Sequence, residues 1–311
     1  MIKRTLYFGN PAYLNIRLAQ LEIRQPEIEK NVTIQTTIKD SMVKRIPIED
    51  IGVVILDNNQ ITITQRALGA LLDNNVAVIT CDEQRMPSGL MLPLSGNSTQ
   101  SERFRHQIEA SLPLKKQLWQ QTIQAKIHNQ SMLLYHQRQL DCGNMRKWAK
   151  NVKSGDTDNL EGRAAAFYWK NIFGHIKDFR RDKDGIPPNN LLNYGYSILR
   201  AVVARSLVGS GLFPTLGIHH HNRYNAYCLA DDIMEPYRPY VDKLVTEIVD
   251  TNQNITSLTT EIKRKLLSIP ILDVTINDRR SPLMIGVSIT TASLYKCYSG
   301  EIRKISYPIM E

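Results

Sequence analysis

The sequence has no long apolar run. Its longest runs, such as Val53–Leu56, have the length of a strand, whereas a membrane-spanning helix needs about 18–20 consecutive apolar residues. At the N-terminus, Asn10 and Pro11 follow Met1–Tyr7 too closely to leave room for the apolar core of a signal peptide. We therefore expect a cytoplasmic protein that neither enters a membrane nor is exported.

Cysteine is also scarce. The four cysteines, Cys81, Cys142, Cys228 and Cys297, lie far apart and form no Cys-x-x-Cys pair, which excludes a zinc ribbon and a small disulfide framework. We expect four unrelated thiols, buried or half-buried, in a reducing compartment.

The composition is otherwise that of a folded protein. The chain has 311 residues, of which 42% are hydrophobic and 22% are charged, so it is long enough for two domains of ordinary size. Lysine and arginine number 39 against 30 for aspartate and glutamate, a formal net charge of +9. This excess favours a polyanionic partner such as nucleic acid, but enzymes with phosphate-bearing substrates can be equally basic.

Short stretches that alternate apolar and polar residues fill the first part of the chain, up to about Leu94. This period of two is typical of strands with one buried face. We predict strands at Tyr13–Leu18, Leu21–Ile23, Val32–Ile34, Val53–Leu56, Ile61–Thr64 and Val76–Thr80, and one short helix at Gln65–Leu72.

The period changes after the polar segment Ser95–Ser101, which is the expected domain boundary. Beyond it, apolar residues recur at helical spacing, first in a long helix that begins near Pro113. The predicted fold class is α+β with two domains: a small, mostly β N-terminal domain (residues 1–97) and a larger all-α C-terminal domain (residues 98–311). Later helices are predicted at Tyr196–Val208, with Asn189 and Asn190 as N-caps, at Val241–Val249 and at Ile262–Leu267.

Glu161 stands at the start of a helical segment that continues as Gly162-Arg163-Ala164-Ala165-Ala166. Asp158 lies three residues earlier, which is the spacing of a capping box, so the simpler interpretation makes Glu161 a helix cap. The functional alternative is that glycine and three alanines leave little bulk beside the carboxylate, so that a phosphate backbone or a metal ion can approach. The spacing alone favours the cap.

Three consecutive histidines, His219, His220 and His221, follow Gly217 and Ile218. Imidazole is a common ligand of Mn²⁺, Zn²⁺ and related cations. Neighbouring side chains diverge in any backbone conformation, so we expect one of the three to reach a given centre.

Asp231, Asp232 and Glu235 form an acidic cluster directly before Pro236. On a helix Glu235 shares a face with each aspartate, and like charges this close repel. Such a cluster is tolerated in water, which is the simpler interpretation, or beside a cation or arginine that offsets the repulsion. Pro236 is expected to kink or end the helix at this point.

Taken in this order, the three segments resemble the CRISPR-associated spacer-acquisition integrases (Cas protein one), especially the form found in type II systems. The resemblance covers nearly the whole chain. It rests on an ordered set of motifs: Cys81-Asp82, Met91-Leu92-Pro93, Glu161-Gly162 with Ala164-Ala165, Asn193-Tyr194-Gly195-Tyr196, His220, and the stretch from Ala230 to Asp242.

The resemblance implies that Glu161, His220 and Glu235 are the catalytic residues and together bind Mg²⁺ or Mn²⁺, with Asp232 close by. His219 is the alternative to His220. In the reaction of the family, the 3′-hydroxyl of a prespacer DNA attacks a phosphodiester at the boundary of the CRISPR repeat, and with water as nucleophile the same site cuts DNA.

The resemblance also implies the partners. These are double-stranded DNA, as prespacer and repeat, a second copy of the chain in a homodimer formed through the N-terminal domain, and the small CRISPR adaptation protein (Cas protein two) that bridges the dimers. The effector nuclease of type II systems is a further partner.

Two other functions stay open on the sequence. One is a freestanding metal-dependent nuclease of branched or single-stranded nucleic acid. The other is a non-catalytic DNA-binding scaffold, in which Glu161 caps its helix and the acidic cluster faces solvent. Arg163, Lys170, Arg223 and Arg238 lie near the motifs, either as contacts to the DNA backbone or as solvated surface charges.

Overall fold

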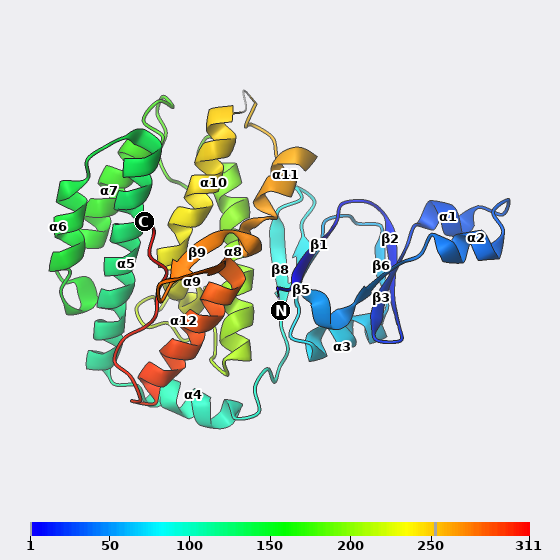
Figure 1. Ribbon diagram of the computed structural model, residues 1–311, viewed down its shortest axis with the longest axis horizontal. Coiled ribbons are helices and arrows are strands. Elements are labelled where there is room, and N and C mark those ends of the chain that lie inside the picture. Colours follow the sequence, from blue (N-terminus) through cyan, green and yellow to red (C-terminus); the bar gives the residue numbers. More distant parts are fainter. Residues whose placement is uncertain (1, 252–253) are drawn as a thin grey trace. The chain divides into compact units, whose positions relative to one another are not determined.

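The computed structural model describes residues 2–251 and 254–311 and divides the chain into two compact units, Met1–Gly96 and Asn97–Glu311. Figure 1 shows strands concentrated in the first unit and long helices in the second. The predicted fold class is therefore confirmed: a mostly β unit precedes a larger helical one. The division falls within the polar segment Ser95–Ser101.

The N-terminal unit is built on two four-stranded sheets. Its strands are β1 (Arg4–Phe8), β2 (Ala12–Arg17), β3 (Gln20–Arg24), β4 (Lys44–Pro47), β5 (Ile51–Leu56), β6 (Ile61–Ile63), β7 (Ala77–Cys81) and β8 (Pro87–Met91), and its helices are α1 (Pro26–Lys30), α2 (Thr36–Ser41) and α3 (Gln65–Asp73). One sheet has the order β1-β5-β7-β8 and the other β4-β3-β2-β6. β5 is paired in parallel on both sides, which explains why its sequence is a continuous apolar run without alternation.

One apolar core joins both sheets to α3. Leu14 and Leu21 of the second sheet, Val54 of the first and Leu71 of α3 are all buried in it. The hydroxyl of Thr64 caps α3 by accepting the backbone N–H of Ala67 at 3.3 Å. The helix predicted at Gln65–Leu72 is confirmed.

The predicted strand Val32–Ile34 is wrong. These residues form a turn between α1 and α2, and Val32 is 95% exposed. The side chain of Asn31 accepts hydrogen bonds from the backbone N–H and the hydroxyl of Thr33, at 2.9 and 2.6 Å. This local turn outcompetes an alternation of only three residues.

Two long helices of the C-terminal unit, α5 and α8, each pack against several other elements. Its elements are α4 (Gln100–Glu109), α5 (Leu112–Arg138), α6 (Gly143–Asn151), α7 (Leu160–Ile172), α8 (Asn189–Gly209), α9 (Cys228–Met234), α10 (Arg238–Thr251), α11 (Thr260–Leu266), β9 (Asp273–Ile276), β10 (Arg279–Pro282) and α12 (Leu283–Tyr298). α5 packs against α6 and α7 and also against α10 (Figure 1). Beside its apolar residues α5 buries Thr122, Lys126 and Asn129, and polar groups buried in this way need partners.

Two details of this unit differ from the prediction. The N-cap position of α8 is Pro188, so Asn189 and Asn190 are the first helical residues and not N-caps. The buried amide of Asn189 donates to the carbonyls of Arg180 and Ile186, at 2.8 and 2.9 Å. The unit expected to be all-α also contains the antiparallel hairpin β9–β10.

The thiols are as expected. All four cysteines are free, with Cys142, Cys228 and Cys297 buried and Cys81 half-buried. Among the residues described by the structure, no helix is long and apolar enough to cross a membrane.

Candidate active site

Glu161 lies in the first turn of α7 and does not cap that helix. The N-cap is Asn159, whose Oδ1 accepts the backbone N–H of Gly162 at 3.1 Å. Asp158, the other half of the expected capping box, forms an ion pair with Lys153 at 2.8 Å. The capping interpretation is therefore wrong, because the carboxylate of Glu161 takes no part in the N-cap of α7.

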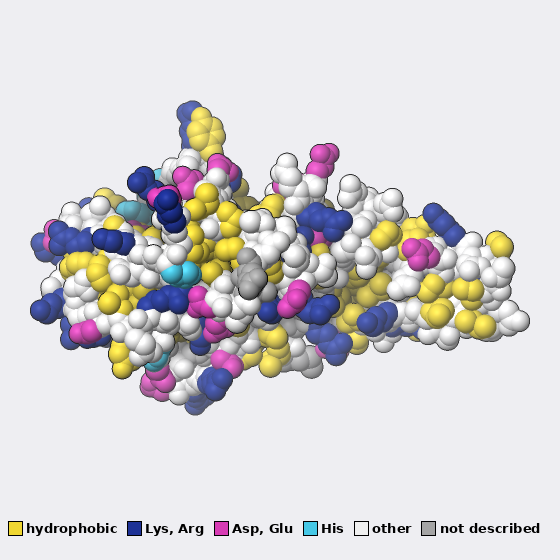
Figure 2. Space-filling model, turned by 90° about the horizontal axis from the view of Figure 1, so that it is seen from above, with side chains coloured by type: hydrophobic (Ala, Val, Ile, Leu, Met, Phe, Trp, Pro, Cys, Tyr) yellow, Lys and Arg dark blue, Asp and Glu magenta, His cyan; other side chains and the backbone are white. Residues whose placement is uncertain are grey.

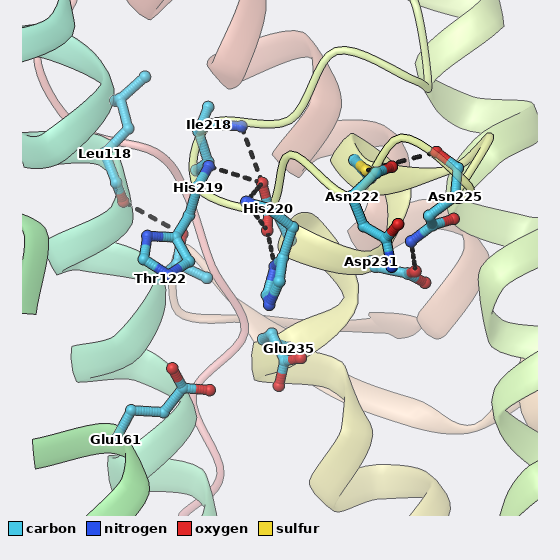
Figure 3. A network of polar contacts seen from close by, with 12 residues as sticks. Leu118, Thr122, Glu161, Ile218, His219, His220, Asn222, Asn225, Asp231 and Glu235 are labelled. Atoms are coloured by element: carbon cyan, nitrogen blue, oxygen red, sulfur yellow. Dashed lines mark hydrogen bonds and ion pairs between the residues drawn. The ribbon is translucent and has the colours of Figure 1, made fainter. Parts of the chain in front are cut away.

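The carboxylate of Asp232 organises the loop that carries the three histidines. It is fully buried, and its Oδ2 accepts the backbone N–H groups of Ile218 and His219, at 2.7 and 2.9 Å. Its Oδ1 is hydrogen-bonded to Nδ1 of His220, and this bond raises the pKa of His220 against the opposing effect of burial. The other ring nitrogen, Nε2, is left for a further partner, and Figure 3 shows the ring directed toward Glu235.

The side chain of His219 points in a different direction from that of His220. Its ring stacks on the indole of Trp119, with ring centroids 4.1 Å apart and planes 1° apart. Burial and the neighbouring His220 lower the pKa of His219, so this ring is uncharged at neutral pH. The His220 ring meets the same indole edge-on, and all three histidines are exposed residues. Of the three, His220 is the one that approaches the acidic residues.

The acidic cluster is buried, so the expectation that it faces water is wrong. Asp231, Asp232 and Glu235 are 8%, 0% and 3% exposed. Asp231 accepts a hydrogen bond from Nε of Arg200 at 2.7 Å, and Asp232 binds the histidine loop. The repulsion between these carboxylates is offset by separate partners, which is the second alternative that the sequence allowed.

The turn that carries Glu235 is held from two sides. α9 ends just before it, and Pro236 lies in the short 3₁₀ helix Glu235–Tyr237, as the proline predicts. The amide of Asn129 on α5 donates to the carbonyls of Pro236 and Pro308, at 2.8 and 3.0 Å. Its oxygen accepts the backbone N–H of Met310 at 2.9 Å. Asn129 thus ties the turn both to α5 and to the segment near the C-terminus.

Glu161 and Glu235 meet at Lys126 of α5. Its Nζ lies 2.6 Å from Oε1 of Glu161 and 2.6 Å from Oε2 of Glu235, so these two oxygens are at most twice that distance apart. The contact between Nζ of Lys126 and Oε2 of Glu235 is an ion pair between two buried side chains. The side chains of Lys126 and Glu235 are 10% and 4% exposed, whereas Glu161 is 24% exposed. Solvent therefore reaches this cluster on the Glu161 side.

The buried charges stabilise one another. Burial by itself lowers the pKa of Lys126, but the carboxylates of Glu235 and Glu161 outweigh burial and raise this pKa above its ordinary value. Burial favours the neutral form of Glu235, yet Arg238 and Lys126 outweigh it and hold the pKa of Glu235 below its usual value. Glu235, Lys126 and Arg238 are therefore ionised at neutral pH.

One of the four basic residues considered for DNA contacts belongs to this network. Nη2 of Arg238 lies 3.1 Å from Oε1 of Glu235, so Arg238 holds that carboxylate. Arg163, Lys170 and Arg223 are exposed. Figure 2 shows Lys and Arg side chains interspersed with Asp and Glu on one face of the molecule, so surface charge on that face does not mark out a path for DNA.

The donor atoms suit a divalent cation. In residues 2–251 and 254–311, no three His, Cys, Asp or Glu side chains are already arranged to hold a metal ion. The carboxylates of Glu161 and Glu235 nevertheless face one cation, the ammonium of Lys126, and His220 adds an imidazole nitrogen. Two carboxylates and one imidazole, open on one side to phosphate oxygens, fit Mg²⁺ or Mn²⁺.

The sequence-based prediction missed Lys126, Trp119 and Asn129, all on α5. A signal was present: Thr122, Lys126 and Asn129 follow Leu118 at helical spacing, on the face expected to be apolar. A lysine on such a face is stable only beside a buried carboxylate, which could have linked α5 to one of the acidic motifs.

Comparison with protein families places these residues in a known group. The family model described as CRISPR associated protein Cas1 matches residues 25–268. A CRISPR-associated endonuclease Cas1 from Neisseria meningitidis serogroup C (strain 8013) is 36% identical over 268 residues, which cover 86% of this chain and 83% of that relative.

Solved structures share the fold. A casposase bound to integration product matches with a TM-score of 0.76 and 20% identity, over 98% of this chain and 92% of that chain. A Cas6-RT-Cas1–Cas2 complex matches with a TM-score of 0.71 and 19% identity, over 97% of this chain and 35% of that chain.

Proposed function

Because the chain belongs to the family of CRISPR-associated Cas1 proteins, we propose that it is an integrase and endonuclease that inserts prespacer DNA into a CRISPR array. The observation that carries the proposal is that Glu161 and Glu235, which are distant in sequence, contact one buried cation, with the ring of His220 directed toward Glu235. The Neisseria relative is named an endonuclease, and the casposase structure contains an integration product.

In this proposal Glu161, His220 and Glu235 bind Mg²⁺ or Mn²⁺. The bound cation supplies Lewis acidity at a phosphodiester. The residues of the chain hold the ligands in place: Asp232 takes the Nδ1 side of His220 and leaves Nε2 for binding, and Arg238 holds one oxygen of Glu235. DNA approaches from the side of Glu161, because the carboxylate of Glu161 is more exposed than that of Glu235.

The proposed reaction exchanges one phosphodiester for another. The 3′-hydroxyl of the prespacer gives up its proton, and its oxygen forms a bond to phosphorus as the bond between phosphorus and the 3′-oxygen of the repeat strand breaks. The leaving oxygen takes up a proton, so the reaction releases and consumes one proton. With water in place of the 3′-hydroxyl, the same displacement cuts the strand.

The proposed partners are double-stranded DNA, a second copy of the chain joined through the N-terminal unit, and the small adaptation protein Cas2. The shared fold of a structure that contains Cas1 and Cas2 supports the last of these. The effector nuclease of type II systems is proposed on the sequence resemblance alone.

A strand-transfer assay tests the proposal. The purified protein and its Cas2 partner are mixed with a labelled prespacer that ends in a 3′-hydroxyl and with a supercoiled plasmid that carries the repeat. We expect joined product in Mn²⁺ or Mg²⁺, none in EDTA, and none from Glu161→Gln or Glu235→Gln. Glu247→Gln, which changes an exposed carboxylate of α10, is the matched control and should join DNA normally.

The two rival functions give different results. A freestanding nuclease would cut the labelled DNA in Mn²⁺ and join none of it. A scaffold would bind DNA but neither cut nor join it in any metal; that interpretation required Glu161 to cap α7 and the acidic cluster to face water, and neither is so.

A further inference from the structure

Lys126 is a buried cation within a site made of metal-binding side chains. Its ammonium contacts one oxygen of Glu161 and one of Glu235, each at 2.6 Å. Lys126 is only 8% exposed, so the two carboxylates and not bulk water are the main partners of its ammonium. A lysine is almost never buried without such partners.

The charges in the cluster balance without a metal. Glu161 and Glu235 carry two negative charges, and Lys126 and Arg238 carry two positive charges. A divalent cation beside a retained Lys126 ammonium would bring two like-charged groups within a few ångströms in a poorly hydrated site, which is strongly unfavourable. Arg238 binds the other oxygen of Glu235, Oε1, at 3.1 Å.

We infer that Lys126 and the divalent cation compete for the same two carboxylates. In the metal-free protein the ammonium holds Glu161 and Glu235 together and prevents their repulsion. When the cation binds, the flexible four-carbon stem lets the ammonium move away. Lys126 thus stabilises the empty site and weakens metal binding. This inference rests on the proposed metal site.

The test is a Mn²⁺ titration of the purified full-length protein, followed by calorimetry or by the electron paramagnetic resonance signal of free Mn²⁺. Lys126→Met keeps most of the side-chain volume and removes the competing charge. We expect it to bind Mn²⁺ at least about tenfold more tightly than the wild type. Lys126→Arg keeps a permanent charge that pairs well with carboxylates, so it should bind Mn²⁺ no more tightly than the wild type.

Thermal unfolding gives a second measurement. In EDTA, Lys126→Met should unfold at a lower temperature than the wild type, because two carboxylates lose their common partner. Saturating Mn²⁺ should raise its melting temperature by more than it raises that of the wild type, because tighter binding stabilises more. Lys116→Met, at an exposed lysine on the same helix, is the control and should behave as the wild type in both solutions.

The outcomes separate this inference from the proposed function. If the wild type binds Mn²⁺ and Lys126→Met binds it equally or more weakly, the competition is overturned while the metal site stands. If neither protein binds Mn²⁺ at millimolar concentration, the metal site of the proposed function fails and the competition fails with it. Loss of wild-type binding in Glu161→Gln and Glu235→Gln assigns the measured Mn²⁺ to these carboxylates.

Discussion

The imidazole of His220 is hydrogen-bonded through Nδ1 to the buried carboxylate of Asp232. The same carboxylate accepts backbone N–H groups from the loop on which His220 stands, so one side chain fixes both the loop and the ring. Asp232 lies on α9, directly before the turn that carries Glu235. Two of the three proposed ligands are thus positioned by one short helix.

The first prediction separates His220 from its neighbour. His220→Ala should lower the strand-transfer rate by about 10³-fold, or about 4 kcal/mol at the transition state, because it removes the ring directed toward Glu235. His219→Ala should lower the rate far less, because His219 packs on Trp119. Single-turnover strand transfer measures both rates. A larger loss in His219→Ala than in His220→Ala would show that His219, and not His220, is the ligand.

The second prediction concerns Asp232. In Asp232→Asn the amide nitrogen cannot accept the hydrogen bonds that one carboxylate oxygen now accepts, so the direction of His220 is lost. We expect Mn²⁺ affinity and strand transfer to fall by about 10–100-fold. Asp278→Asn, at an exposed turn residue, is the control. Unchanged Mn²⁺ affinity in Asp232→Asn would show that the loop holds its shape without this carboxylate.

The third prediction concerns Asn129. Asn129→Ala leaves the carbonyls of Pro236 and Pro308 and the N–H of Met310 without their partner. The free energy of unfolding should fall by about 3 kcal/mol, measured by urea denaturation. Asn151→Ala, at an exposed asparagine, should change it little. Equal stability of the two variants would rule out a structural role for these three hydrogen bonds.

The fourth prediction is that the free energy of unfolding depends on pH because of Asp242. Burial raises the pKa of Asp242 to about 6, although the hydroxyls of Tyr196 and Tyr168 donate to it and partly offset burial. A carboxyl whose pKa is higher in the folded than in the unfolded chain stabilises the fold at low pH, and this contribution is lost as the pH rises through the folded value. The wild type should therefore lose on the order of 2–3 kcal/mol from this group between about pH 4 and about pH 7.

Asp242→Asn isolates this contribution, because its amide stays neutral throughout that range. Urea denaturation at several pH values should show the stability of the wild type falling relative to the variant as the pH rises. Parallel curves for the two proteins would mean that Asp242 has an ordinary pKa in the fold.

The order of elements could be predicted because it depends on local periodicity. A period of two gives the strands β2 and β3 almost to the residue, and a helical period gives α5 and α10. The prediction failed at Val32–Ile34, where the side chain of Asn31 forms a turn, and at the start of α7, where Asn159 caps in place of Asp158. In both cases an asparagine side chain that accepts hydrogen bonds from nearby residues decided the backbone conformation.

The partners of the acidic residues could not be predicted in the same way. Asp231, Asp232 and Glu235 are close in sequence, but each is neutralised by a different distant group: Arg200, the histidine loop, and Lys126 with Arg238. Which carboxylate remains for a ligand depends on tertiary contacts that spacing does not encode. The family resemblance named Glu161, His220 and Glu235, and the structure brings these three side chains to one place; their role as ligands stays a prediction.

The full set of three hydrogen bonds of the Asn129 side chain can form only late in protein synthesis. The turn of Glu235 is tied, through one amide, to residues that leave the ribosome more than seventy positions later, at Pro308 and Met310. A nascent chain in which α5, α7 and α9 have already been synthesised still lacks the hydrogen bonds of Asn129 to Pro308 and Met310. A chain that has not yet reached Pro308 and Met310 would therefore hold the turn of Glu235 less firmly, because the amide of Asn129 lacks two of its three partners.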